Sequence, residues 1–371
     1  MNLLPIGSQL SGRKPRWWAA ALRLTGTVSL AMRRSIASIP VLKGTPKEDP
    51  LDVIDAKLPE FVQSARYYTE LFHRWERLGV HVTPVHFYSP IPEVTQLGDA
   101  PWQTPYDLNG IDMNGAYQLR LLEDEFPRLR MEYEQLPRVP SNNPLAFYLD
   151  NNLISGTDAL VLYCMIRHFQ PRKVIEVGSG FSSRLTLQAL RRNGFGDLIC
   201  IEPYPTNPGQ HDLFREAVPG LELLAQPVQE VEMAIFESLQ AGDVLFIDSS
   251  HVARIGGDVP FLFLRVLPRL GPGVIVHVHD IYLPFEFRRD WVEEHLRFWN
   301  EQYVLHAFLL YNTEWEVLFA NTWMNERYPD AMRRTFPTSP WWGGGSFWMR
   351  RRSSPDEATR ERTESHSRRA S

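Results

Sequence analysis

Residues 173–183 read KVIEVGSGFSS, a short apolar run followed by a turn with Gly178 and Gly180 and by the polar start of a helix. Glycine lets the backbone turn tightly and approach a ligand closely, and the free amides of a helix N-terminus attract a carboxylate or phosphate. Glu176 and Ser182 flank this turn. The stretch therefore predicts a strand, a ligand-binding loop and a helix.

Four more apolar, partly β-branched runs follow and alternate with segments of helical character. They are LICIE (198–202), LELLA (221–225), DVLFID (243–248) and GVIVHVHD (273–280). This alternation is typical of βαβ units around a parallel sheet, and such continuous hydrophobicity fits strands that are covered on both faces. We further expect a strand at 303–310, a helix from Thr313 and a final strand at 346–351, the two strands pairing antiparallel at one edge.

The chain has 371 residues, which is enough for one large α/β domain and a smaller unit. We expect a poorly ordered basic leader (1–50), a helical and irregular cap on the substrate side (51–150), the α/β domain (151–352) and a disordered tail (353–371). The leader carries eight Lys or Arg and no acid before Glu48.

The composition favours an ordinary soluble protein. Apolar residues make up 43% and charged residues 22%, and the formal net charge of −5 provides no general basic surface for nucleic acid. We therefore expect no nucleic-acid partner. Cys164 and Cys200 have no metal-ligand spacing and fit a reducing compartment, so we expect a cytoplasmic location. Residues 13–34 are basic and contain two tryptophans, which is compatible with a weak contact to a membrane surface and equally with a plain disordered leader. The oligomeric state is not predicted.

Glu202 ends the second predicted strand, 22 residues after Gly180. A carboxylate at that position can accept the hydroxyl hydrogens of an adenosine ribose. Ser183 stands where a dinucleotide fingerprint has its third glycine, and a Walker lysine is absent. These features favour a sulfonium cofactor whose amino group lies on the Glu176 side of the loop. A nicotinamide-dependent oxidoreductase with a degenerate fingerprint, and a non-catalytic binding protein on the same fold, are the alternatives.

Four segments in fixed order make a more specific pattern: LDNNLISGTDALVLYCMIRHFQPRKVIEVGSGFSS (149–183), IEPYP (201–205), DVLFIDSSHV (243–252) and LPRLGPGVIVHVHDIYLPFEF (267–287). The set resembles a bacterial family of class I S-adenosylmethionine-dependent methyltransferases, which is often associated with the modification of glycans or secondary metabolites. The resemblance implies a Rossmann-like, mostly parallel sheet of seven strands with an antiparallel final hairpin. It also implies methylation of a hydroxyl on a small-molecule or glycan acceptor.

The resemblance assigns the cofactor site by position. The methionine part of S-adenosylmethionine would lie against Glu176, Gly178 and Gly180, with Ser182 beside them at the helix start. The ribose would lie at Glu202, the adenine would contact Tyr204 and Gln229, and Asp248 would form the floor of the catalytic cleft.

Two hypotheses exist for the catalytic group. Asp248, His279 and Asp280 are placed much like the ligands of magnesium-dependent O-methyltransferases, which implies a divalent metal, although imidazole is a poor ligand for Mg²⁺. Alternatively, His251 or His279 acts as a general base, because histidine titrates near neutral pH. The sequence leaves both open.

Overall fold

The computed structural model describes residues 65–83, 85–143, 145–205, 211–214 and 217–353. The chain divides into two compact units, Met1–Leu97 and Gly98–Ser371. In the described part of the first unit, helix α4 (Ala65–Glu76) falls within a segment of helical apolar spacing, and a 3-10 turn η2 follows at Val94–Gln96. The predicted leader, with its segment 13–34, and residues 354–371 of the predicted tail lie outside the described residues.

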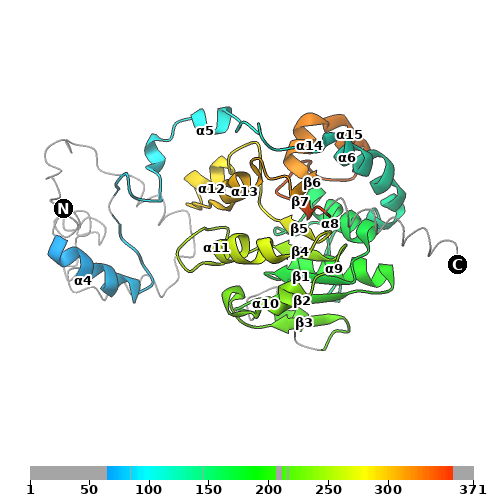
Figure 1. Cartoon of the computed structure of the whole chain (residues 1–371), viewed down its shortest axis with the longest axis horizontal. Coiled ribbons are helices and arrows are strands. Elements are labelled where there is room, and N and C mark those ends of the chain that lie inside the picture. Colours follow the sequence, from blue (N-terminus) through cyan, green and yellow to red (C-terminus); the bar gives the residue numbers. More distant parts are fainter. Residues whose placement is uncertain (1–64, 84, 144, 206–210, 215–216, 354–371) are drawn as a thin grey trace. The chain divides into compact units, whose positions relative to one another are not determined.

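A seven-stranded sheet forms the centre of the second unit, in the order β3-β2-β1-β4-β5-β7-β6 (Figure 1). The strands are β1 (Lys173–Val177), β2 (Asp197–Ile201), β3 (Leu221–Leu224), β4 (Val244–Ile247), β5 (Ile275–Val278), β6 (Trp315–Ala320) and β7 (Phe347–Arg351). Strands β1 to β5 pair in parallel, and β7 runs antiparallel to both β5 and β6. The predicted Rossmann-like fold is confirmed.

The two faces of the sheet are both covered, as the continuous hydrophobicity of the strands predicts. Successive strand residues point to opposite faces. Val174 and Phe246 therefore lie in one core, together with residues of α8 (Gly156–Phe169) and α9 (Phe181–Asn193). Their neighbours Ile175 and Leu245 lie in a second core with residues of α10 (Met233–Glu237) and α11 (Asp258–Phe261).

The remaining helices of the second unit are short. Their bounds are α5 (Ala100–Gln103), α6 (Gly115–Arg120), η3 (Leu121–Glu125), η4 (Phe126–Leu129), α7 (Arg130–Tyr133), η5 (His211–Phe214), η6 (Val228–Glu230), α10 (Met233–Glu237), α11 (Asp258–Phe261), η7 (Leu262–Val266), η8 (Leu267–Arg269), α12 (Arg289–Glu293), α13 (Glu301–Leu309), α14 (Asn321–Arg327) and α15 (Pro329–Thr335). None of the helices in the described residues is long and apolar enough to cross a membrane.

The division between the units differs from the expected cap of 51–150. Residues 98–150 belong to the unit that contains the sheet. The reason is packing: the Phe126 ring lies 5.3 Å from the ring of Phe319 in β6, and the Tyr133 hydroxyl donates to the Thr335 carbonyl in α15 at 2.5 Å. The helices of 115–133 therefore help to bury the edge strand β6.

The last part of the sheet differs from the prediction in where its strand begins. The segment 303–310, predicted as a strand, lies in helix α13, and the segment from Thr313, predicted as a helix, contains strand β6. In α13 the buried residues are Glu301, Gln302, Leu305 and Leu309, which have helical spacing. The β-branched and aromatic character of the segment hides that period.

Candidate active site

Glu176 lies in β1 with its side chain fully buried beneath the loop that follows the strand. The hydroxyls of Ser182 and Ser183, in the first turn of α9, donate to its Oε1 at 2.5 and 3.0 Å. Its other oxygen, Oε2, has no hydrogen-bond partner among the described residues. A buried carboxylate oxygen without a partner is costly, so it indicates a place where a donor from a ligand or water belongs.

Burial raises the pKa of the Glu176 carboxyl to about 8, although the hydrogen bonds from Ser182 and Ser183 act in the opposite direction. The carboxyl is therefore largely protonated at neutral pH. A cationic group placed beside Oε2 would favour the ionised form and would release the proton.

The two glycines of the loop have different roles. Gly178 has a φ of +98°, and a Cβ there would lie 2.3 Å from the carbonyl oxygen of Asp248, so this position accepts only glycine. A Cβ on Gly180 would meet no protein atom within 4 Å. Gly180 therefore borders open space. Gly178, in contrast, allows the backbone after β1 to lie close against the backbone after β4.

The residues assigned to ribose and adenine follow β2 and β3. Glu202 is buried, and its Oε1 accepts a hydrogen bond from the Tyr204 amide at 2.7 Å. The Tyr204 side chain is 69% exposed. Gln229 is exposed and donates from Nε2 to the Gly256 carbonyl at 3.1 Å. Glu202 and Glu176 thus lie at the carboxyl ends of the neighbouring strands β2 and β1, and open α/β sheets bind their ligands beyond these ends.

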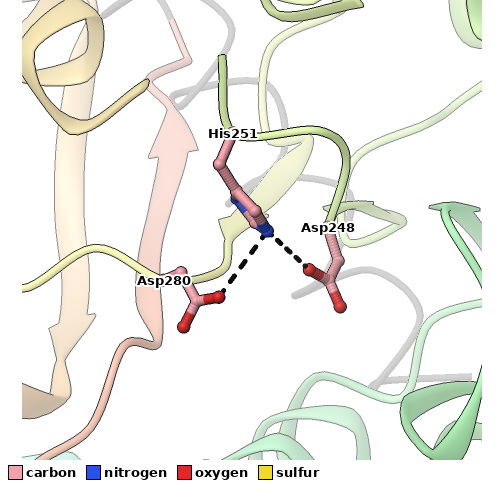
Figure 2. A group of neighbouring side chains, drawn as sticks. All are labelled: Asp248, His251 and Asp280. Carbon is pink, nitrogen blue, oxygen red and sulfur yellow. Dashed lines mark ion pairs between the residues drawn. The ribbon is translucent and has the colours of Figure 1, made fainter. Parts of the chain in front are cut away.

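The next two strand ends bring an imidazole between two carboxylates (Figure 2). The Nε2 of His251 lies 3.3 Å from Asp248 Oδ1 and 3.6 Å from Asp280 Oδ2. One ligand atom from each of these three residues lies within 4.8 Å of the others. We call this group the Asp-His-Asp cluster. Its donor set, two carboxylates and one imidazole nitrogen, suits a divalent cation of the first transition series.

The backbone of the cluster is held in an unusual conformation. His251 and Asp280 both have left-handed φ values, 60° and 56°. Such values are uncommon outside glycine and concentrate at functional sites, because the surrounding structure must compensate for them. Here helix α13 provides that support: the amides of Asn300 and Glu301 both donate to the His251 carbonyl, at 3.0 and 3.1 Å.

Glu301 is a site residue that the sequence reasoning missed. It is 1% exposed, and its Oε2 lies 3.0 Å from Nδ1 of His251. A carboxylate on the second nitrogen fixes the orientation of an imidazole and directs the other nitrogen to its ligand. An acid directly before the apolar run of 303–310 was the available signal, but it required a helix where the sequence suggested a strand.

The protonation of the cluster decides which chemistry it can perform. Desolvation lowers the pKa of His251, but Asp248 and Glu301 on its two sides outweigh that effect and raise it well above the usual value. Desolvation likewise raises the pKa of Asp248, yet His279 and His251 bring it down to about 2. Without another cation, His251 is an imidazolium at neutral pH, so it is poorly suited to accept a proton.

His279 does not take the position that the sequence suggested. It is buried, its Nε2 is 4.0 Å from Asp280 Oδ1, and the group within 4.8 Å contains His251 in its place. The neighbouring His277 is fully buried, with its ring 4.1 Å from that of Phe246 and 4.5 Å from that of Trp348. Within the described residues, the three groups that lie close enough to share one ion are therefore Asp248, His251 and Asp280, and His279 lies outside this set.

Two surface hollows lie elsewhere. One is lined by α9 and residues of 137–147, the other by the amino-terminal ends of β1, β2 and β4. Neither contains a predicted site residue.

Part of the chain matches a known protein family. Residues 175–281, which span β1 to the end of β5, match the family described as "Methyltransferase domain". An uncharacterized protein from Archaeoglobus fulgidus is 32% identical over 173 residues, covering 44% of this chain and 76% of the archaeal protein. The chain belongs to this family and is a class I S-adenosylmethionine-dependent methyltransferase.

Solved structures give weaker likenesses. A Podospora anserina methyltransferase bound to S-adenosylhomocysteine is 13% identical, covers 62% of this chain and 88% of its own, and has a TM-score of 0.35. An O-methyltransferase from Bacillus cereus, also in complex with S-adenosylhomocysteine, is 13% identical, covers 62% of this chain and 90% of its own, and has a TM-score of 0.32. Scores this low carry no argument about this chain, and the family is assigned by the match of residues 175–281.

Proposed function

We propose that this methyltransferase transfers the methyl group of S-adenosylmethionine to a hydroxyl oxygen of a small-molecule or glycan acceptor. The observation that carries the proposal is the Asp-His-Asp cluster, which lies at the ends of β4 and β5, beside the strand ends that carry Glu176 and Glu202. An amine acceptor needs little help to attack a sulfonium once it is neutral. A hydroxyl benefits from a group that removes its proton, and Asp280 of this cluster supplies a carboxylate for that purpose.

The proposed cofactor contacts follow the strand ends. The α-amino group of S-adenosylmethionine lies at the unpartnered Oε2 of Glu176, its carboxylate lies near the N-terminus of α9 at Gly180 and Ser182, and the ribose hydroxyls donate to Glu202. Tyr204 and Gln229 border the adenine. These contacts leave the methyl group free to face Asp248.

The transfer itself is a single displacement. The acceptor oxygen forms a bond to the methyl carbon while the bond from sulfur to carbon breaks, its electron pair remains on sulfur, and the hydroxyl proton passes to the Asp280 carboxylate. Positioning supplies most of the acceleration, since no covalent intermediate with the protein is required.

We further propose that the cluster holds a divalent metal through Asp248, His251 and Asp280. The donor set fits, and the Nδ1 contact of His251 to Glu301 is the arrangement that metal-binding histidines usually have. When bound, such an ion would lower the pKa of an acceptor hydroxyl. Because His251 carries a proton otherwise, metal binding should release that proton and strengthen as the pH rises.

The test is methyl transfer to matched acceptors that differ only in hydroxyl or amino groups, with the product examined for a methoxy or an N-methyl signal by NMR. We expect methoxy products.

We also expect removal of metal with EDTA to lower turnover about 100-fold, with recovery on adding Mn²⁺ and a tighter apparent metal affinity at pH 8 than at pH 6.5. Products methylated on nitrogen or carbon would contradict the O-methylation, and full turnover in verified metal-free protein would contradict the metal.

A further inference from the structure

Two tryptophans and an arginine form a platform, with Trp291 in α12 and the other two residues in the segment between α12 and α13. The rings of Trp291 and Trp299 lie edge to face with centroids 5.0 Å apart, and the guanidinium carbon of Arg297 is 5.2 Å from each centroid. The Arg297 amide donates to the Trp291 carbonyl at 2.8 Å, and Leu296 has a left-handed φ of 55°. This turn folds Arg297 back over both rings. We call the three side chains the Trp-Arg platform.

The platform adjoins the Asp-His-Asp cluster through two separate contacts. The Trp299 ring lies 4.3 Å from the His251 ring. The Trp291 ring lies 5.6 Å from Tyr282, whose hydroxyl donates to Asp280 Oδ1 at 3.1 Å. A molecule bound to the platform would therefore lie next to the cluster, separated from His251 by the Trp299 ring and from Asp280 by Tyr282.

Arg297 differs from its neighbouring arginines in its partners. Arg288 pairs with Asp290 at 2.8 Å, and Arg289 pairs with Asp99 and with Glu293. In the described part of the chain, Arg297 forms no ion pair within 4.0 Å, and it is exposed. A guanidinium held by aromatic rings keeps its planar fork of donors available for a carboxylate or phosphate.

We propose that the Trp-Arg platform is an acceptor subsite for a ring compound that carries an anionic group, a carboxylate or a phosphate. This inference rests on the proposed function and adds the class of acceptor to it. The exposed parts of the half-buried tryptophans would pack against the ring of the acceptor, and Arg297 would bind the anion. The charges orient the acceptor, because the acids Asp248, Asp280 and Glu301 repel an anion from the cluster and leave that place to the hydroxyl.

Binding to the full chain loaded with S-adenosylhomocysteine tests the proposal, using calorimetry and two matched pairs of probes. The pairs are 3,4-dihydroxybenzoate with its methyl ester, and galacturonate with galactose. We expect the anionic member of at least one pair to bind about tenfold more tightly than the neutral member, as one charged hydrogen-bonded contact provides. Arg297→Gln should abolish that preference, and Trp299→Leu should weaken both members of the pair.

Arg289→Gln is the matched control, since Arg289 lies nearby in α12, is likewise exposed and already has acidic partners. It should keep the preference. Absence of an anionic preference in both pairs, or its persistence in Arg297→Gln, would overturn the subsite. Because binding is read without turnover, protein that binds anionic rings through Arg297 but never forms a methoxy product would contradict the proposed function alone.

Discussion

His251→Ala lowers methyl transfer at saturating S-adenosylmethionine by about 100- to 1,000-fold, the range expected when a group that activates the acceptor is lost. The variant leaves Asp248 and Asp280 without the imidazole between them and removes the contact to Glu301. Cofactor binding should change less than about threefold, because His251 is not among the groups assigned to the cofactor. Initial rates of S-adenosylhomocysteine formation and a cofactor titration measure the two effects.

His279→Ala is the informative comparison. It removes a buried histidine that lies outside the Asp-His-Asp cluster, so turnover should fall much less than in His251→Ala. Equal losses in the two variants would return His279 to the catalytic centre. Full activity in both His251→Ala and Asp248→Ala would rule out the cluster as the site of acceptor activation.

Gly178→Ala has the largest expected effect on stability. The new Cβ would lie 2.3 Å from the Asp248 carbonyl oxygen, and the φ of +98° is unfavourable for alanine. Backbone strain and the displaced β4 loop together cost about 3 kcal/mol or more, which lowers the melting temperature by about 6–12 °C for a unit of this size. Thermal unfolding followed by circular dichroism measures the change.

Gly180→Ala provides the matched control. A Cβ at Gly180 meets no protein atom within 4 Å, and its φ of 166° is extended backbone, so the melting temperature should change little. The added methyl group would instead occupy the space assigned to the methionine part of the cofactor, and binding of S-adenosylmethionine should weaken. Equal destabilisation by both substitutions would contradict the different roles of the two glycines.

The sheet could be predicted because its strands carry a strong local signal. The runs at 173–177, 198–202 and 243–248 are apolar on both faces, and β1, β2 and β4 occupy them. The final hairpin was misplaced because Tyr303, Val304 and Phe308 favour a strand locally. Tertiary burial of Leu305 and Leu309 selects a helix there.

The site was only partly predictable for a different reason. The acids at strand ends could be located because parallel strands end at a common edge. The choice between His251 and His279 depends on the left-handed turns at His251 and Asp280, and the support from Glu301 depends on α13. Neither is a property of sequence spacing.

Calorimetric titration of the wild-type chain and of Glu202→Ala with S-adenosylmethionine, and separately with NAD, is the most direct test of the central claim. We predict that the wild-type chain binds S-adenosylmethionine and does not bind NAD. In Glu202→Ala, the binding of S-adenosylmethionine should be about tenfold weaker because the ribose contacts are lost. At pH 7, buffers of different ionisation enthalpy should reveal a released proton, because an ammonium bound at the proposed place would ionise Glu176, whose pKa is about 8. No binding of S-adenosylmethionine, or a preference for NAD, would contradict the cofactor site described for this methyltransferase.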